Sequence, residues 1–79
     1  MSKKIEVYST GYCPYCVRAK TLLEDKGLEY TEINLDGKAA ELMALKEKTG
    51  QRTVPQIFID DEFIGGFTEL SQLNSDGKL

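Results

Sequence analysis

The sequence predicts an α/β fold in which three helices pack against a mixed four-stranded sheet, in the order β-α-β-α-β-β-α. An apolar run at residues 5–8 is followed by a short polar turn and by a helical segment from Pro14. A second extended segment and a second helix come next, a succession typical of parallel strands joined by right-handed crossovers. Two short β-rich runs, 56–60 and 62–64, then indicate an antiparallel hairpin.

Length and composition predict one small domain over residues 1–79. The net charge of −3 argues against a nucleic-acid partner, which usually needs a basic patch. No apolar run approaches the roughly 18 residues of a membrane span. Residues 1–4 lead into the first strand rather than into a signal-peptide apolar region. We therefore expect a cytoplasmic monomer without a membrane partner.

The first helix is expected to begin at Pro14, because proline suits the first helical position. Lys26 and Gly27 predict its end, with a cation and a C-terminal glycine. The alternation of residues 28–35 predicts a second strand that is interrupted near Glu32. The apolar residues expected on the inner face of the first helix are Val17, Ala19, Leu22 and Leu23.

The second helix is expected to open at Asp36-Gly37 and to end at Gly50. Its expected core face comprises Ala39, Leu42 and Met43, with Leu45 at its margin. Asp60-Asp61 predicts the hairpin turn. A short last helix at 68–73, capped by Thr68, is expected to follow, and residues 74–79 to form a frayed tail.

The two cysteines of the chain, Cys13 and Cys16, lie three residues apart with Pro14 directly after the first. A Cys-x-x-Cys beside a βαβ pattern is typical of redox chemistry. At a helix N-terminus, unpaired N–H groups and the helix dipole favour a thiolate, and such motifs lower the cysteine pKa from about 8.5 to about 3.5–7.5. We predict that Cys13 is the nucleophile and that Cys16, deeper in the helix, is the resolving thiol.

Three other uses of the cysteine pair are less favoured. A structural bridge that closes so short a loop stabilises by only about 2 kcal/mol in the chain-entropy model. A structural zinc site normally needs four ligands and would therefore need two chains, because the sequence has no histidine and no third cysteine. Small copper chaperones also place this motif after a first strand, but they have no helix between their second strand and the following hairpin. No metal is therefore expected.

Three motifs together resemble the dithiol glutaredoxins of the Cys-Pro-Tyr-Cys type, in the thioredoxin-like superfamily. These motifs are Cys13-Pro14-Tyr15-Cys16, Thr53-Val54-Pro55 and Gly65-Gly66, and the resemblance runs over residues 5–79. It implies a thioredoxin-like fold and a glutathione-dependent oxidoreductase that reduces protein–glutathione mixed disulfides and protein disulfides. Glutathione would be the co-substrate, and ribonucleotide reductase is one candidate protein partner.

The resemblance also implies how glutathione would lie. Pro55 would be cis, turning the Val54 backbone towards the cysteines to pair with the cysteine moiety of glutathione. The last helix would hold the γ-glutamyl carboxylate at its N-terminus, and Arg52 and Gln51 would meet the glycine carboxylate. The implied glutathione contacts are Tyr15, Gln51, Arg52, Thr53, Val54, Pro55, Gly66, Phe67, Thr68 and Glu69.

Several positions depart from the family pattern. Thr10 stands where many members have lysine, and Leu42 where many have a polar or basic residue. Arg52 and Lys38 would then hold the glycine carboxylate alone, and glutathione affinity would be lower. Phe67 replaces a common cysteine, and Glu69 a common aspartate. Iron–sulfur binding by two chains is a further hypothesis, against which Pro14 argues, because members that bind clusters usually lack this proline.

Overall fold

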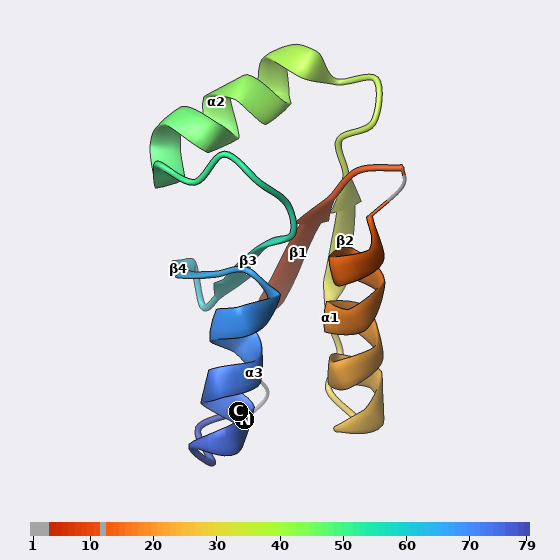
Figure 1. Cartoon of the computed structure of the whole chain (residues 1–79), viewed down its shortest axis with the longest axis vertical. Coiled ribbons are helices and arrows are strands. Elements are labelled where there is room, and N and C mark those ends of the chain that lie inside the picture. The colour runs from red at the N-terminus through yellow and green to blue at the C-terminus, as the bar shows by residue number, and fades with distance from the viewer. Residues whose placement is uncertain (1–3, 12) are drawn as a thin grey trace.

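Residues 4–11 and 13–79 are described by the structure, a computed structural model. They form β1 (Ile5–Ser9), α1 (Pro14–Asp25), β2 (Thr31–Asn34), α2 (Ala39–Thr49), β3 (Gln56–Ile59), β4 (Glu62–Gly65) and α3 (Phe67–Ser75). The predicted order of elements and the fold class are both confirmed (Figure 1). None of the helices in this part of the chain is long and apolar enough to cross a membrane.

The sheet has the strand order β2-β1-β3-β4. β1 pairs parallel with β2 and antiparallel with β3, and β3 pairs antiparallel with β4. Because β1 and β3 are antiparallel, Tyr8 near the end of β1 lies opposite Gln56 at the start of β3. Gly65 at the end of β4 lies opposite Ile57. The sheet therefore brings the segments that follow β1, precede β3 and follow β4 to one edge.

Each face of the sheet has its own hydrophobic core. Ile5 and Val7 of β1 and Ile57 of β3 are buried under α1 and α3, whose contributions are Ala19, Leu23 and Leu70. The other core consists of Leu35, Leu45 of α2 and Phe58 of β3, with Tyr8 and Phe63 packed against it. Neighbours such as Ile57 and Phe58 thus serve opposite faces, as the alternation of a strand requires. In Figure 1, α1 and α3 lie side by side and α2 stands apart from them.

The inner face of α1 differs from the prediction at Val17. This side chain is 56% exposed, and Cys16 is buried in its place with Ala19 and Leu23. Residues 16, 19 and 23 follow the 3–4 spacing of one helical stripe, and position 17 lies about 100° further round the axis.

β2 is shorter than the predicted strand over 28–35. Gly27 adopts a φ of 70°, and the Leu28 N–H donates to Leu23 O at 3.0 Å. This bond belongs to the end of α1, so Leu28 is not available to a strand there. Leu28 and Tyr30 instead pack against the core under α1 and α3.

The core face of α2 is also different from the expected one. Ala39 and Met43 are exposed, whereas Leu42 is half-buried and Leu45 is buried. The inward stripe thus runs through 42, 45 and 49, where Thr49 donates a hydrogen bond to Gln56 Oε1 at 2.8 Å. α2 ends before Gly50, as predicted.

The start and end of α3 both correct the sequence prediction. The helix begins at Phe67 with Gly66 as its N-cap, so Thr68 is not the cap. The Gly66 N–H donates instead to Glu69 Oε1 at 2.7 Å. Residues 74–79 are not a frayed tail, because α3 continues to Ser75, the Lys78 N–H donates to Leu73 O at 2.9 Å, and Leu79 packs on the core.

Candidate active site

Cys13 is the N-cap of α1, with extended backbone angles of φ −153° and ψ 100°. The Cys16 N–H donates to Cys13 Sγ at 3.2 Å, so one of the free N–H groups of the helix end points at this sulfur. The two cysteines are joined in a disulfide, with their Cα atoms 5.1 Å apart. Cys13 is half-buried and Cys16 is 2% exposed. Cys13 is therefore the more accessible of the two cysteines.

The loop before β3 lies directly against Cys13. The Val54–Pro55 peptide bond is cis, as predicted, and Val54 O lies 3.7 Å from Cys13 Sγ. The polar backbone of Val54 is therefore beside the reacting sulfur.

One pocket of about 320 Å³ opens on the α3 side of this loop. It brings together every expected glutathione contact except Arg52. Its lining residues are Tyr15, Gln51, Thr53, Val54, Pro55, Gly66, Phe67, Thr68 and Glu69.

A second pocket of about 490 Å³ lies on the α2 side and contains Cys13 itself. Tyr15, Thr53 and Val54 line both pockets, so the two meet beside the cysteine. We call these two adjoining pockets together the depression beside Cys13. The other residues of the second pocket are Thr10, Pro14, Leu42, Lys46 and Arg52.

Lys46 is a cation of this site that the sequence reasoning missed, and Lys38 is not part of it. Lys38 precedes α2 and lines a different pocket with Tyr8 and Leu35. Lys46 follows Leu42 by four residues, so the two share one helix face. That spacing was the available signal, because the departure at Leu42 already pointed to this face. Lys46 and Arg52 are the two cationic residues that line the second pocket.

A buried amide network supports the loop from Gln51 to Pro55. Gln56 is fully buried, and its Nε2 donates to Gln51 O at 2.7 Å and to Thr53 O at 3.1 Å. The Gln51 side chain donates to Thr53 O and Pro55 O, both at 3.2 Å. The Gln51 amide nitrogen is thus used by the loop, whereas the sequence reasoning assigned this residue to the glycine carboxylate. The role of Gln56 was missed, since a glutamine at a strand start has no distinctive spacing.

Neighbouring atoms lie too close to Gly65 and Gly66 for a side chain at either position to fit without a shift. A Cβ built on Gly66 would lie 3.2 Å from Pro55 O, and one on Gly65 would lie 2.5 Å from Glu69 Oε1. Gly65 also has a φ of 118°, which side chains rarely adopt. The glycines therefore allow the N-terminus of α3 and the Glu69 carboxylate to lie against the loop that contains Pro55.

Aromatic rings border the depression beside Cys13. The Tyr15 and Phe67 ring centroids are 6.2 Å apart, and the Arg18 guanidinium carbon lies 5.1 Å from the Tyr15 centroid. Tyr15 is 55% exposed, so its ring is a surface that a bound molecule can contact.

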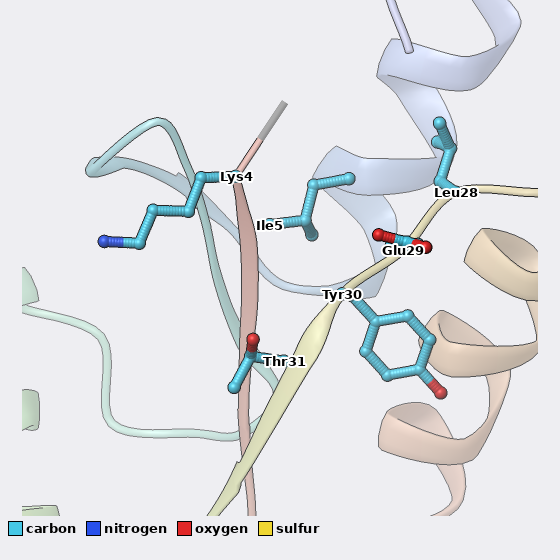
Figure 2. Close-up of a pocket in the computed structure, with 6 residues that line it drawn as sticks. All are labelled: Lys4, Ile5, Leu28, Glu29, Tyr30 and Thr31. Carbon is cyan, nitrogen blue, oxygen red and sulfur yellow. The ribbon is translucent and has the colours of Figure 1, made fainter. Parts of the chain in front are cut away.

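Another pocket, of about 520 Å³, lies near the opposite end of α1 and shares no residue with the cysteine site. Its residues come from the start of β1 and from the segment that leads into β2 (Figure 2). The Tyr30 hydroxyl points away from Lys4 and donates to Glu24 Oε2 at 2.6 Å. This hydrogen bond, with burial, raises the pKa of Tyr30 to about 12. The tyrosine of this pocket is therefore held in the neutral form.

Comparisons with known proteins agree with the geometry of the cysteine site. The Glutaredoxin family model matches residues 5–64. Glutaredoxin-C6 of Oryza sativa subsp. japonica is 49% identical over 81 residues, covering 99% of this chain and 72% of that protein. Glutaredoxin 3 of Escherichia coli K12 is 45% identical over 75 residues, covering 95% of this chain and 90% of that protein.

A solved structure gives the same result for the fold. The crystal structure of a buckwheat glutaredoxin–glutathione complex superimposes with a TM-score of 0.91 at 40% identity, covering 98% of this chain and 73% of that one. The cysteine pair at the start of α1, the loop before β3 and the glycines before α3 are thus set in a fold shared with close relatives. The chain belongs to the glutaredoxin family, the glutathione-dependent thiol–disulfide oxidoreductases.

Proposed function

We propose that this protein reduces protein–glutathione mixed disulfides and protein disulfides through Cys13 and Cys16. The placement of Cys13 is the observation that carries the proposal. It caps α1, lies 3.7 Å from the Val54 carbonyl, and stands where two pockets meet, with Cys16 buried behind it. A nucleophile needs access to substrate, and a resolving thiol needs only to reach the nucleophile.

In the first reaction, the Cys13 thiolate attacks the glutathione sulfur of a mixed disulfide. The bond between glutathione and the substrate breaks, a bond between Cys13 and glutathione forms, and the substrate leaves as a thiolate that takes up a proton. A second glutathione, as thiolate, then attacks the glutathione sulfur bound to Cys13. Glutathione disulfide leaves, and the Cys13 thiolate is restored.

In the second reaction, the Cys13 thiolate attacks a protein disulfide and forms a mixed disulfide with one substrate sulfur, releasing the other as a thiolate. The Cys16 thiol loses its proton and attacks Cys13, which releases the second substrate sulfur and forms the Cys13–Cys16 disulfide. Two glutathione molecules supply two electrons to reduce this disulfide and become glutathione disulfide. Two thiols three residues apart at a helix start can close this bond without moving the backbone far.

Glutathione would lie along the depression, with its cysteine sulfur at Cys13. Its cysteine moiety would pair with the Val54 backbone, as one added strand residue. Its γ-glutamyl carboxylate would face the N-terminus of α3 near Thr68, where free N–H groups and the helix dipole favour an anion. Arg52 and Lys46 would face its glycine carboxylate. The buckwheat relative, solved with glutathione, supports this choice of ligand.

Finer parts of the proposal concern the setting of the enzyme. We propose that it acts as a single domain and a monomer in the cytoplasm, without a bound metal, and that ribonucleotide reductase is among its electron acceptors. A coupled ribonucleotide reductase assay tests that acceptor directly, and the absorbance of freshly purified protein tests the expected absence of an iron–sulfur cluster.

The deciding experiment is turnover of a small glutathione mixed disulfide, with glutathione and glutathione reductase as the recycling system. NADPH consumption that depends on glutathione is expected, and Cys13→Ser should abolish it. Reduction that proceeds only with a thioredoxin reductase, and not with glutathione, would overturn the proposal.

A further inference from the structure

Val17 is exposed beside the cysteine pair without a structural reason. It is 56% exposed, although it directly follows the buried Cys16. Valine is a weak helix former, so an exposed valine in the first turns of α1 gains little for the fold. Among the described residues the exposed large apolar side chains are Tyr15, Val17 and Met43, and the first two flank Cys16.

Val17 lines a groove of about 330 Å³ between α1 and α3. Three of its lining residues are apolar, Val17 and Leu22 from α1 and Phe67 from α3, and Ser71 lies one turn beyond Phe67. In Figure 1 the two helices lie side by side with their N-terminal ends towards the same end of the molecule. The groove therefore runs away from the cysteine end along both helices.

The groove is continuous with the cysteine site. Phe67 lines both the groove and the 320 Å³ pocket, and its ring lies 6.2 Å from that of Tyr15. In the proposed reaction, glutathione occupies the depression along Val54. The protein chain attached to the other sulfur must then leave Cys13 across a different surface, and this groove is an apolar path next to the site.

Charge changes sign along the groove. Arg18 lies at the end near Tyr15, and no carboxylate among residues 4–11 and 13–79 forms an ion pair with it. Asp25 lies at the other end, seven residues later and so about 10 Å along the helix. A segment bound here would meet positive charge close to its reacting cysteine.

We propose that the α1–α3 groove binds an extended segment of the protein substrate, with an apolar side chain over Val17, Leu22 and Phe67 and an acidic side chain at Arg18. The inference rests on the proposed function, because it concerns the protein side of the disulfide that Cys13 attacks. It selects substrates whose reacting cysteine has an acidic residue within about three positions, given about 3.3 Å per extended residue.

The test uses two glutathionylated peptides of equal length, identical except for glutamates or lysines two and three positions from the cysteine on both sides. The wild-type protein should have a kcat/KM about two- to five-fold higher for the glutamate peptide, the scale of an exposed ion pair. Arg18→Glu should reverse this preference. Lys26→Glu, which changes the net charge equally at the C-cap of the same helix but outside the groove, should leave it unchanged.

A small mixed disulfide of glutathione and mercaptoethanol, assayed in parallel, tests the proposed oxidoreductase function separately from substrate binding in the groove. Its turnover by the wild type tests the proposed function alone, and the effect of Arg18→Glu on the peptides is judged by the ratio of their two kcat/KM values, in which any change in the shared Cys13 thiolate cancels. If the small substrate is reduced normally but the two peptides are reduced equally well, or Arg18→Glu does not change their ratio, the groove proposal is wrong.

A steric variant provides a second, charge-independent test. Ser71→Trp should fill the groove and lower kcat/KM for a glutathionylated peptide with apolar flanking residues, while turnover of the small substrate reports an intact fold and site. If that peptide is reduced as fast as by the wild type while Arg18→Glu also has no effect, no segment is bound between α1 and α3.

Discussion

The first turn of α1 determines how strongly the Cys13 thiolate is stabilised. Its sulfur accepts the Cys16 N–H at 3.2 Å and sits at the positive end of a 12-residue helix. In the reduced protein the same N–H would stabilise a thiolate at Cys13, whereas Cys16 is only 2% exposed. Burial and the neighbouring anion both favour the neutral Cys16 thiol.

The first prediction is that Cys13 of the reduced protein titrates well below the ordinary cysteine pKa of about 8.5, and that Cys16 titrates above it. The pH dependence of alkylation by iodoacetamide, with mass spectrometry to locate the label, measures both. The Cys16→Ser variant isolates the first titration. A Cys13 alkylation rate that rises only above about pH 8 would show that the helix end does not stabilise the thiolate.

The second prediction concerns the cations of the second pocket. Arg52→Ala and Lys46→Ala should each raise KM for a small glutathione mixed disulfide by roughly two- to five-fold, and the double variant should raise it further, because each loses one exposed contact to a carboxylate. Stability should change little. Lys38→Ala, which removes the same charge from another pocket, is the matched control. An unchanged KM in the double variant would show that another group holds the carboxylate.

Single residues of the site were predictable where they belong to a motif. Cys13 lies at the start of α1, as Pro14 indicated, and Val54 and Gly66 line one pocket, as the family resemblance implied. Lys46 and Gln56 were not found, since their roles depend on how α2 is turned and on which loop carbonyls need donors. The orientation of α2 and the hydrogen-bonding needs of the loop depend on tertiary packing, which cannot be inferred from a single sequence.

At the scale of the element, two polar links join α1 to the β2 side of the sheet. Lys20 Nζ lies 2.8 Å from Glu32 Oε2, which also accepts the hydroxyl of the buried Ser9 at 2.9 Å. One turn further along α1, Glu24 accepts the Tyr30 hydroxyl. These links fix the helix that presents Cys13, so they affect the site through its position.

The third prediction is a pH-dependent stability difference between wild type and Lys20→Met. The hydrogen bonds from Lys20 and Ser9 hold the pKa of Glu32 below its usual value of 4.5. A lowered carboxyl pKa stabilises the folded state above the unfolded value, and this contribution is lost as the pH falls through the lowered pKa. Because the Glu32 side chain is 37% exposed, the loss at pH 7 should be below about 1 kcal/mol.

Urea unfolding at pH 7 and at pH 3 measures this difference, with Lys26→Met as the control for loss of one positive charge at the C-cap of the same helix. The gap between wild type and Lys20→Met should shrink at the lower pH. An equal gap at both pH values would mean that the Lys20 stem, and not its ion pair with Glu32, carries the effect.

The type and order of the helices and strands were predictable, but their ends and inward faces were less so. The end of α1 takes the Leu28 N–H that a longer β2 would need. In α2, Ala39 and Met43 fit an apolar stripe as well as Leu45 does, and only packing against Leu35 and Phe58 selects among them. Glu69 caps α3 from inside the helix, whereas sequence reasoning placed the cap on Thr68. Each difference arises from competition for a hydrogen bond or a core position.

At the scale of the whole molecule, the sheet order explains why three distant motifs form one site. Adjacent antiparallel β1 and β3 place the residues after β1 beside those before β3, and β4 returns to the same edge. The cysteine pair, the Thr53–Pro55 loop and the paired glycines therefore converge. The sequence predicted the order of elements but not that β3 lies beside β1, and the burial of Cys16 and the depression beside Cys13 depend on how the helices pack.

The central claim is that the fold divides the work between an accessible Cys13 and a shielded Cys16. Removal of a glutathione mixed disulfide needs one enzyme thiolate, because free glutathione can resolve the intermediate. Reduction of a protein disulfide benefits from a second thiol nearby, since the intermediate otherwise waits for glutathione. The two activities should therefore respond differently to loss of Cys16.

The most direct measurement compares Cys16→Ser and Cys13→Ser in two assays, reduction of a small glutathione mixed disulfide and reduction of a protein disulfide. Cys16→Ser should keep or raise the first activity, because the competing Cys13–Cys16 disulfide cannot form, and should lose most of the second. Cys13→Ser should lose both. Loss of both activities in Cys16→Ser together with either activity in Cys13→Ser would contradict the assignment of nucleophile and resolving thiol.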